Sequence, residues 1–161
     1  MKTRSQRAGK QKANAKITAG PSAKARANAK SPTSVTRPTR TVILDHVSLP
    51  VRDLKAARAF YSAALGAIGM RINLDFSSAF GLGSRDENIF WLTRDRNASG
   101  HGHYAFRVDH REEVAAFHAA ALAAGGKDHG QPGPRPNYGP RYYAAFVKDG
   151  EGNNIEVVCY K

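Results

Sequence analysis

The sequence predicts an α+β domain built from two βαβββ units in a pseudo-two-fold arrangement that forms a curved mixed sheet. A gapless internal repeat is the first observation behind this prediction, because His46 to Gly69 aligns with His103 to Gly126 at one constant offset. The second is that each copy opens with alternating apolar and polar residues and then changes to a helical period. The third is a series of short strand-like segments after each helix, separated by turn residues.

The first unit opens with a strand expected over 42–51. A helix follows, with Asp53 as its expected N-cap and with Phe60 and Ala64 on one face. Gly69 marks its end. The remaining strands of this unit are expected over 71–76, 78–82 and 88–93.

The second unit repeats this order, with a strand over 103–108 and a helix whose expected N-cap is Asp109. Phe117 and Ala121 lie on one face of that helix, and Gly125-Gly126 marks its end. The later strands are expected over 142–148 and 154–160, joined by a turn over 149–152.

Two further expectations concern the connections and the core. The segment 131–140 contains four prolines, so we predict a loop that cannot occupy a central strand. The core should form where the faces of the two helices meet the strands, around the repeat-matched residues Phe60, Leu65, Phe117 and Leu122.

The charge of the chain is concentrated at its N-terminus. The net charge is +12, but residues 1–40 hold eleven Lys and Arg and no acidic residue, which leaves 14 basic against 13 acidic residues in 41–161. A domain near +1 offers no broad basic surface, so we do not expect it to bind nucleic acid. The expected organisation is a basic tail over 1–40 and one domain over 41–161, made of units 42–98 and 99–161.

The tail contains mainly Ala, Lys, Arg, Ser, Thr and Pro, which cannot bury enough apolar surface to fold. We therefore predict that residues 1–40 are disordered. Weak binding to polyanions, an organelle transit peptide and a dispensable extension are all compatible with this composition.

Several protein classes are disfavoured by composition. The chain has no apolar run of membrane-spanning length and no apolar stretch typical of a secretory signal. Cys159 is the single cysteine, so neither an internal disulfide nor a cysteine-based zinc site can form. We expect a cytoplasmic protein without a membrane span.

Three residues form a candidate ligand set. His46 and His103 occupy equivalent positions in the repeat, and Glu156 lies in an apolar strand where a buried carboxylate needs a partner. Two imidazoles and one carboxylate suit a divalent metal such as Fe(II), Mn(II) or Zn(II). Ordinary hydrogen-bonded histidines are the alternative interpretation.

These segments resemble the vicinal oxygen chelate superfamily. The resemblance rests on Asp45-His46-Val47, Phe60-Tyr61, His103-Tyr104-Ala105-Phe106 and the closing Asp-Gly-x-Gly-Asn-Asn-Ile-Glu run, and it covers about 42–161. This superfamily includes glyoxalase I, extradiol dioxygenases, fosfomycin-modifying thiol transferases and bleomycin-binding proteins. Because one scaffold carries several reactions there, the resemblance implies the fold more firmly than the chemistry.

The resemblance implies that His46, His103 and Glu156 bind a divalent metal (Fe, Mn, Zn or Ni) and that Glu156 is also catalytic. Glyoxalase I has a fourth ligand, a glutamate, in the matching strand of its first unit. We align Phe90 with Glu156, so this fourth ligand is missing here. A three-ligand site is closer to the pattern of extradiol dioxygenases and fosfomycin-modifying enzymes.

Each narrower identity meets an objection. Classical extradiol dioxygenases are longer and carry more such units. Fosfomycin-modifying enzymes share an arginine beyond the final glutamate, where this chain has only Lys161, so phosphonate recognition would need Arg107, Arg135 or Arg141. Bleomycin-binding relatives lack metal ligands and tend to be acidic.

A concave pocket could surround these ligands. The residues expected to line it are Phe90, Trp91, Arg107, Tyr138, Tyr142 and Tyr143. Ordinary packing of aromatic residues in a sheet is the alternative for the aromatic members of this set.

The leading hypothesis is a metal-dependent enzyme acting on a small molecule, of the lyase, isomerase or dioxygenase type. The cation would act as a Lewis acid on two oxygens of the substrate. A non-catalytic protein that binds or sequesters a small molecule and a fosfomycin-type thiol transferase are the alternatives. The resemblance also implies a homodimer, with each site either inside one chain or shared between two.

Overall fold

The computed structural model describes residues 44–161. The predicted disordered tail, residues 1–40, lies outside the described residues, as do the first two residues of the strand expected over 42–51. Among the described residues, no helix has both the length and the apolar character that crossing a membrane requires.

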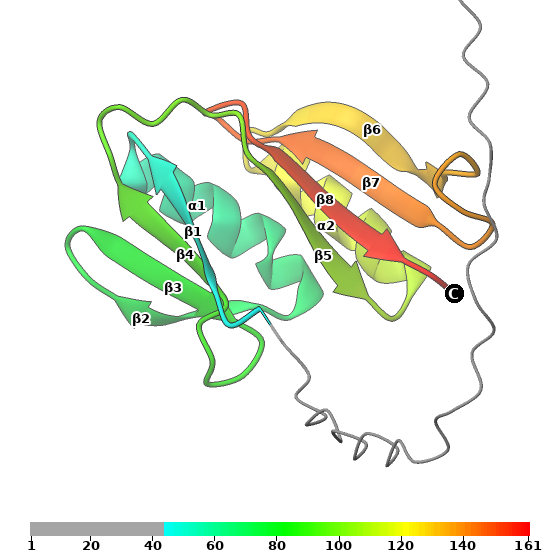
Figure 1. The fold of residues 1–161 in the computed structure, drawn as a ribbon, viewed down its shortest axis with the longest axis horizontal. Helices are drawn as coiled ribbons and strands as arrows, with labels where there is room; N and C mark the ends of the chain where they lie inside the picture. The colour runs from blue at the N-terminus through cyan, green and yellow to red at the C-terminus, as the bar shows by residue number, and fades with distance from the viewer. Residues whose placement is uncertain (1–43) are drawn as a thin grey trace, which may run out of the picture. The chain divides into compact units, whose positions relative to one another are not determined.

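The structure has the predicted α+β architecture with two βαβββ modules (Figure 1). The first module contains β1 (Val47–Val51), α1 (Leu54–Ala64), the short 3-10 helix η1 (Gly66–Ile68), β2 (Arg71–Asp75), β3 (Ala79–Gly83) and β4 (Phe90–Arg94). The second module contains β5 (His103–Val108), α2 (Arg111–Ala123), β6 (Lys127–Pro134), β7 (Tyr143–Lys148) and β8 (Asn154–Cys159).

The eight strands are divided between two mixed sheets with the same topology. The strand order is β1-β4-β3-β2 in sheet 1 and β5-β8-β7-β6 in sheet 2. In each sheet the first strand pairs in parallel with the last strand of its module, and the other neighbours are antiparallel. The predicted internal repeat is therefore a repeat of structure.

The main core lies between the helices and one face of each sheet. Alternate residues of the strands point into it, as expected for strands covered on one side. The helices contribute Phe60 and Phe117, the repeat-matched pair predicted for this role, and both are buried. The opposite face of each sheet is left without a covering helix in the described part of the chain, and we call it the open face.

The two helices begin differently. The Asp53 carboxylate accepts hydrogen bonds from the backbone N–H groups of Lys55 and Ala56, which confirms it as the N-cap of α1. The prediction for α2 was wrong, because its N-cap is His110, whose backbone N–H donates to the Glu113 carboxylate. Asp109 instead accepts a hydrogen bond from the Lys161 ammonium group, and this bond lowers the pKa of the Asp109 carboxyl.

The repeat-matched leucines also differ. Leu65 is fully buried, but the prediction that Leu122 belongs to the core was wrong, since it is 37% exposed. Helix α1 ends at Ala64, so Leu65 starts a 3-10 turn that carries it into the core. Helix α2 continues to Ala123 and therefore keeps Leu122 on a helical surface.

The proline-rich segment 131–140 is only partly a loop. Its first four residues belong to β6, so the prediction of a loop was wrong there. As the edge strand of sheet 2, β6 pairs only with β7, and its register shifts twice between Asp128 and Gly133. An edge strand with bulges tolerates prolines because its outward N–H groups have no partner to lose.

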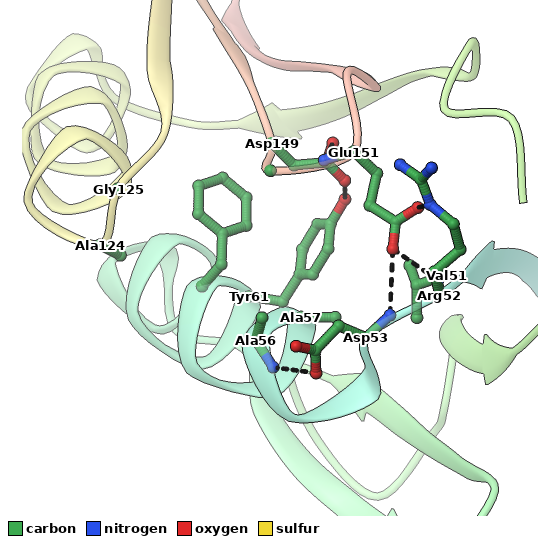
Figure 2. Close-up of a pocket in the computed structure, with 12 residues that line it drawn as sticks. Val51, Arg52, Asp53, Ala56, Ala57, Tyr61, Ala124, Gly125, Asp149 and Glu151 are labelled. Atoms are coloured by element: carbon green, nitrogen blue, oxygen red, sulfur yellow. Dashed lines mark hydrogen bonds and ion pairs between the residues drawn. The ribbon is translucent and has the colours of Figure 1, made fainter. Parts of the chain in front are cut away.

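The β7–β8 turn joins the second module to the first (Figure 2). The Glu151 carboxylate accepts hydrogen bonds from the Arg52 guanidinium and from the backbone N–H groups of Arg52 and Asp53, just before α1. The Tyr61 hydroxyl donates to buried Asp149 over 2.7 Å. Burial, and secondly the charge of Asp149, raise the pKa of Tyr61.

Candidate functional site

The open face of sheet 2 carries a buried carboxylate beside an exposed imidazole. Strands β5 and β8 run parallel, with Ala105 opposite Glu156, so the side chain of His103 lies on the same face as that of Glu156. The Nε2 atom of His103 is 3.0 Å from Oε2 of Glu156. Glu156 is only 2% exposed, whereas the His103 side chain is 52% exposed. Sequence-predicted His103 and Glu156 are therefore in direct contact.

Two polar side chains hold this pair from its two ends. The Tyr142 hydroxyl donates to Oε1 of Glu156 over 2.6 Å, and burial together with this carboxylate raises the pKa of Tyr142. At the other end, the Asn154 amide lies 2.7 Å from Nδ1 of His103. The sequence pattern offered one signal for Asn154, its position two residues before Glu156 on the same strand face.

His46 stands apart from this pair. Its side chain is half-exposed, and its Nδ1 atom lies 2.6 Å from the Asp45 carboxylate. Within residues 44–161, no three His, Cys, Asp or Glu side chains are grouped so that they could hold a metal ion. The structure thus brings together two of the three predicted ligands and leaves the third on the stretch just before β1.

A cavity of about 410 Å³ lies between residues of β1 and β4 on one side and residues of β5 on the other. Its polar members are Asp45 and His103, so the stretch that carries His46 reaches the same cavity as His103. Its other lining residues are apolar or aromatic: Leu44, Val47, Ile89, Phe90, Tyr104, Ala105 and Phe106. We call it the apolar cavity.

A second pocket, of about 420 Å³, adjoins His103 on the open face of sheet 2. It is lined by His103, His129, Gly130, Arg135, Tyr138, Phe146 and Asn154, and we call it the polar pocket. Tyr138, predicted to line a pocket, is one of these residues. The sequence analysis assigned no role to His129, because it has no counterpart in the repeat.

The other predicted pocket residues are scattered. Phe90 lines the apolar cavity but is itself buried in the main core. Arg107 lies two residues beyond Ala105 on the open face of sheet 2, with its guanidinium 5.2 Å from the ring centroid of Tyr160. Tyr143 packs against the main core on the other face and lies beneath Arg111, away from Glu156.

Trp91 lies on the open face of sheet 1. Its ring is stacked on Phe76 at a centroid distance of 6.4 Å. It also packs over Gly81, where an added Cβ would come within 3.0 Å of the indole. These contacts indicate an aromatic surface on sheet 1 where sheet 2 carries charged groups.

A pocket of about 440 Å³ lies at the start of α1, beside the β7–β8 turn (Figure 2). Its three acidic residues already have hydrogen-bond partners: Asp53 caps α1, and Asp149 and Glu151 accept the bonds that join the two modules. None of the residues predicted for the site lines this pocket. The candidate site is accordingly the region around His103 and Glu156.

Comparison with known proteins identifies the family. The model of the Glyoxalase/Bleomycin resistance protein/Dioxygenase superfamily matches residues 43–157. The chain belongs to this superfamily. A search of curated proteins found no match.

Solved structures of the superfamily have the same fold. A glyoxalase/bleomycin resistance protein from Albidiferax ferrireducens is 29% identical, with a TM-score of 0.63, and the match covers 73% of this chain and 98% of the other. A glyoxalase/bleomycin resistance protein/dioxygenase family enzyme from Burkholderia phytofirmans is 20% identical, with a TM-score of 0.59 and coverages of 74% and 100%. A putative glyoxalase from Bacillus halodurans is 22% identical, with a TM-score of 0.57 and coverages of 73% and 95%.

Strand register corrects one alignment within this superfamily fold. Ser48 lies opposite Trp91 in sheet 1, and Ala105, the repeat equivalent of Ser48, lies opposite Glu156 in sheet 2. Trp91, rather than Phe90, is therefore the structural equivalent of Glu156. Trp91, like Phe90, carries no carboxylate.

Proposed function

We propose that this superfamily member is a metal-dependent enzyme acting on a small molecule, with His46, His103 and Glu156 as ligands of a divalent cation. The observation that carries this proposal is the buried Glu156 carboxylate, which contacts His103 on the open face of sheet 2. Burying a charged carboxylate is costly unless it is paired, so its position on an apolar strand needs an explanation. Ligation of a cation provides one, and Glu156 is then also the catalytic residue.

The donor set fits such a cation. Imidazole and carboxylate groups are ligands for Fe(II), Mn(II), Zn(II) and Ni(II). His46 would have to release Asp45 to join the other two ligands. A divalent cation in this site would supply Lewis-acid stabilisation of negative charge on two oxygens of a substrate.

The surrounding residues have separate tasks in this proposal. Tyr142 fixes one oxygen of Glu156 and leaves the other facing His103. The Asn154 amide orients the imidazole through Nδ1, as partners of metal-binding histidines do. The half-exposed ring of His103 lines both the apolar cavity and the polar pocket, which gives a substrate access to it.

The measurement that tests this function is metal occupancy of folded Glu156→Gln protein by atomic spectroscopy. We expect occupancy to fall at least about tenfold, because the substitution keeps the shape and removes the ligand charge. Exposed Glu112 on α2 offers a matched control, and Glu112→Gln should retain wild-type occupancy. Wild-type occupancy in Glu156→Gln would refute the metal site and favour a non-catalytic binding or sequestering protein.

Screening the metal-loaded protein against three substrate classes distinguishes the candidate reaction types. Hemithioacetals test a lyase or isomerase, catechols test a dioxygenase, and thiol–epoxide pairs test a fosfomycin-type transferase. We expect turnover in one of these classes and its loss in Glu156→Gln. Metal binding without turnover in any class would leave only the binding function.

We also propose a homodimer. Strands β1 and β5 are edge strands of their sheets, so each can accept a strand of a second chain. Light scattering at micromolar concentration should give twice the mass of one chain. A monomer with full metal occupancy would refute the version in which two chains share a site. The free, buried Cys159 fits a reducing compartment, and we propose the cytoplasm.

A further inference from the structure

His103 separates two cavities of opposite character. On one side lies the apolar cavity between β1 and β5, whose lining is mostly aliphatic and aromatic. On the other side lies the polar pocket, which contains the cationic side chain of Arg135 and the imidazole of His129. A ligand that touches His103 can therefore extend into both environments at once.

The polar pocket favours a negative charge. Its lining within residues 44–161 contains no carboxylate. Two acidic side chains next to lining residues already have partners. Asp128 accepts hydrogen bonds from His118 and from the Gly130 backbone, and Glu156 is held by His103 and Tyr142. Lys148 stands opposite Asn154 in the strand register and adds a second permanent cation on this face.

Arg135 is held in place without a carboxylate partner among residues 44–161. Its guanidinium donates to the backbone carbonyl of Gln131 over 2.6 Å and lies 5.5 Å from the ring centroid of Phe146. Neutral carbonyl partners leave its positive charge uncompensated, and the fixed side chain loses little further freedom when an anion binds.

The apolar cavity has the opposite preference at its rim. Among residues 44–161, its only charged lining residue is Asp45, an exposed carboxylate that faces His46. A ligand anion placed there would meet a like charge, whereas an apolar group would contact Leu44, Ile89 and Phe106. The two cavities therefore fix the direction in which an amphipathic ligand lies.

We propose that the ligand of this site is an amphipathic organic anion. Its apolar body occupies the cavity between β1 and β5, its anionic group binds Arg135 in the polar pocket, and its reacting oxygens lie beside His103. This inference rests on the proposed function, because it names the substrate class for the same site.

The experiment measures binding of phenylacetate, 3-phenylpropanoate and 4-phenylbutanoate to the full chain by calorimetry, with 3-phenylpropan-1-ol as the uncharged comparison. We expect at least one acid to bind at least about tenfold more tightly than the alcohol. Arg135→Gln should remove this advantage and leave the alcohol unchanged. Arg141→Gln is the matched control, since Arg141 is an exposed arginine of the same β6–β7 connection outside the pocket lining.

Two further variants keep the test decisive. Arg135→Lys retains the charge and should retain most of the preference, which separates charge recognition from loss of loop structure. Leu44→Ser, at a residue 75% exposed, should weaken acid and alcohol alike, about three- to tenfold. Equal binding of acids and alcohol to wild-type protein, or an unchanged preference in Arg135→Gln, would overturn the proposal.

Metal measurements distinguish this failure from failure of the proposed function. The titrations are run on metal-free protein and repeated with Glu156→Gln. If the wild-type protein retains no metal as purified or after metal is added, yet prefers the acids, the ligand class is supported and the enzymatic proposal fails. Retained metal with no acid preference overturns the ligand class alone.

Discussion

The two modules share one topology but differ on their open faces. At the position where sheet 2 carries Glu156, sheet 1 carries Trp91 stacked on Phe76. On the helix side, Tyr61 and His118 occupy equivalent buried positions, yet Tyr61 bonds to the other module and His118 bonds to Asp128 beside it. At this position, therefore, the open face of sheet 2 carries a buried carboxylate with polar partners, whereas sheet 1 presents an aromatic surface.

The largest expected effect on stability comes from the repeat-matched leucines. Leu65→Ala should cost about 2–5 kcal/mol, because it leaves a cavity in the core. Leu122→Ala should cost less than about 1 kcal/mol, since that side chain is partly solvated. Urea unfolding of both variants measures the difference. Equal losses would contradict the burial that distinguishes the two positions.

Variants of Tyr61 and His118 compare how much a hydrogen bond between the modules and one within module 2 contribute to stability. Tyr61→Phe removes the donor to buried Asp149 and should cost about 1–3 kcal/mol. His118→Leu should cost less than about 1 kcal/mol, because its partner Asp128 is exposed and can be solvated. Denaturation midpoints decide the order, and a larger loss in His118→Leu would contradict it.

The same tyrosine predicts a dependence on alkaline pH. Burial, and secondly Asp149, raise the pKa of folded Tyr61 above its ordinary value of 10.0, so the folded group stays protonated when the unfolded one ionises. Its contribution is fully present below pH 10.0 and declines as pH rises above that value. The stability difference between wild type and Tyr61→Phe should therefore stay constant up to about pH 9 and shrink as the pH rises from about 10 to about 11. A constant difference would show that Tyr61 titrates normally.

The smallest expected contrast concerns the helix N-caps. Asp53→Ala should cost about 1 kcal/mol, because two backbone N–H groups lose their acceptor. His110→Ala should cost only a few tenths, about 0.3 kcal/mol, because its backbone N–H still donates to Glu113. Thermal unfolding resolves the two, and comparable losses would show that the His110 side chain caps α2.

Local patterns were sufficient for most of the fold. Alternation and helical period located seven of the eight strands and both helices, with boundary shifts of a few residues at most apart from the start of β1. The missing strand was β6, because glycine and proline are depleted in strands and only its position at the sheet edge permits them. Asp109 was wrong as a cap because its partner, Lys161, is distant in sequence.

Fewer features of the candidate site than of the fold could be predicted from the sequence. Repeat symmetry and strand faces predicted His103 and Glu156, which the structure brings into contact. The equivalence of Trp91 and Glu156 depends on strand register, which alternation alone does not fix to a single residue. The placement of Arg135 over Phe146 depends on bulges in β6 that no local pattern predicts.

The bonds between the β7–β8 turn and the start of α1 have a consequence for how the chain folds. They join Glu151 to Arg52 and Asp149 to Tyr61, pairs separated by 99 and 88 positions along the chain. Closing such long loops costs entropy before any contact repays it, which slows folding. Completion of either module therefore depends on contacts with the other. An isolated first module would lack the Glu151 carboxylate, which accepts from the backbone N–H groups of Arg52 and Asp53 just before α1.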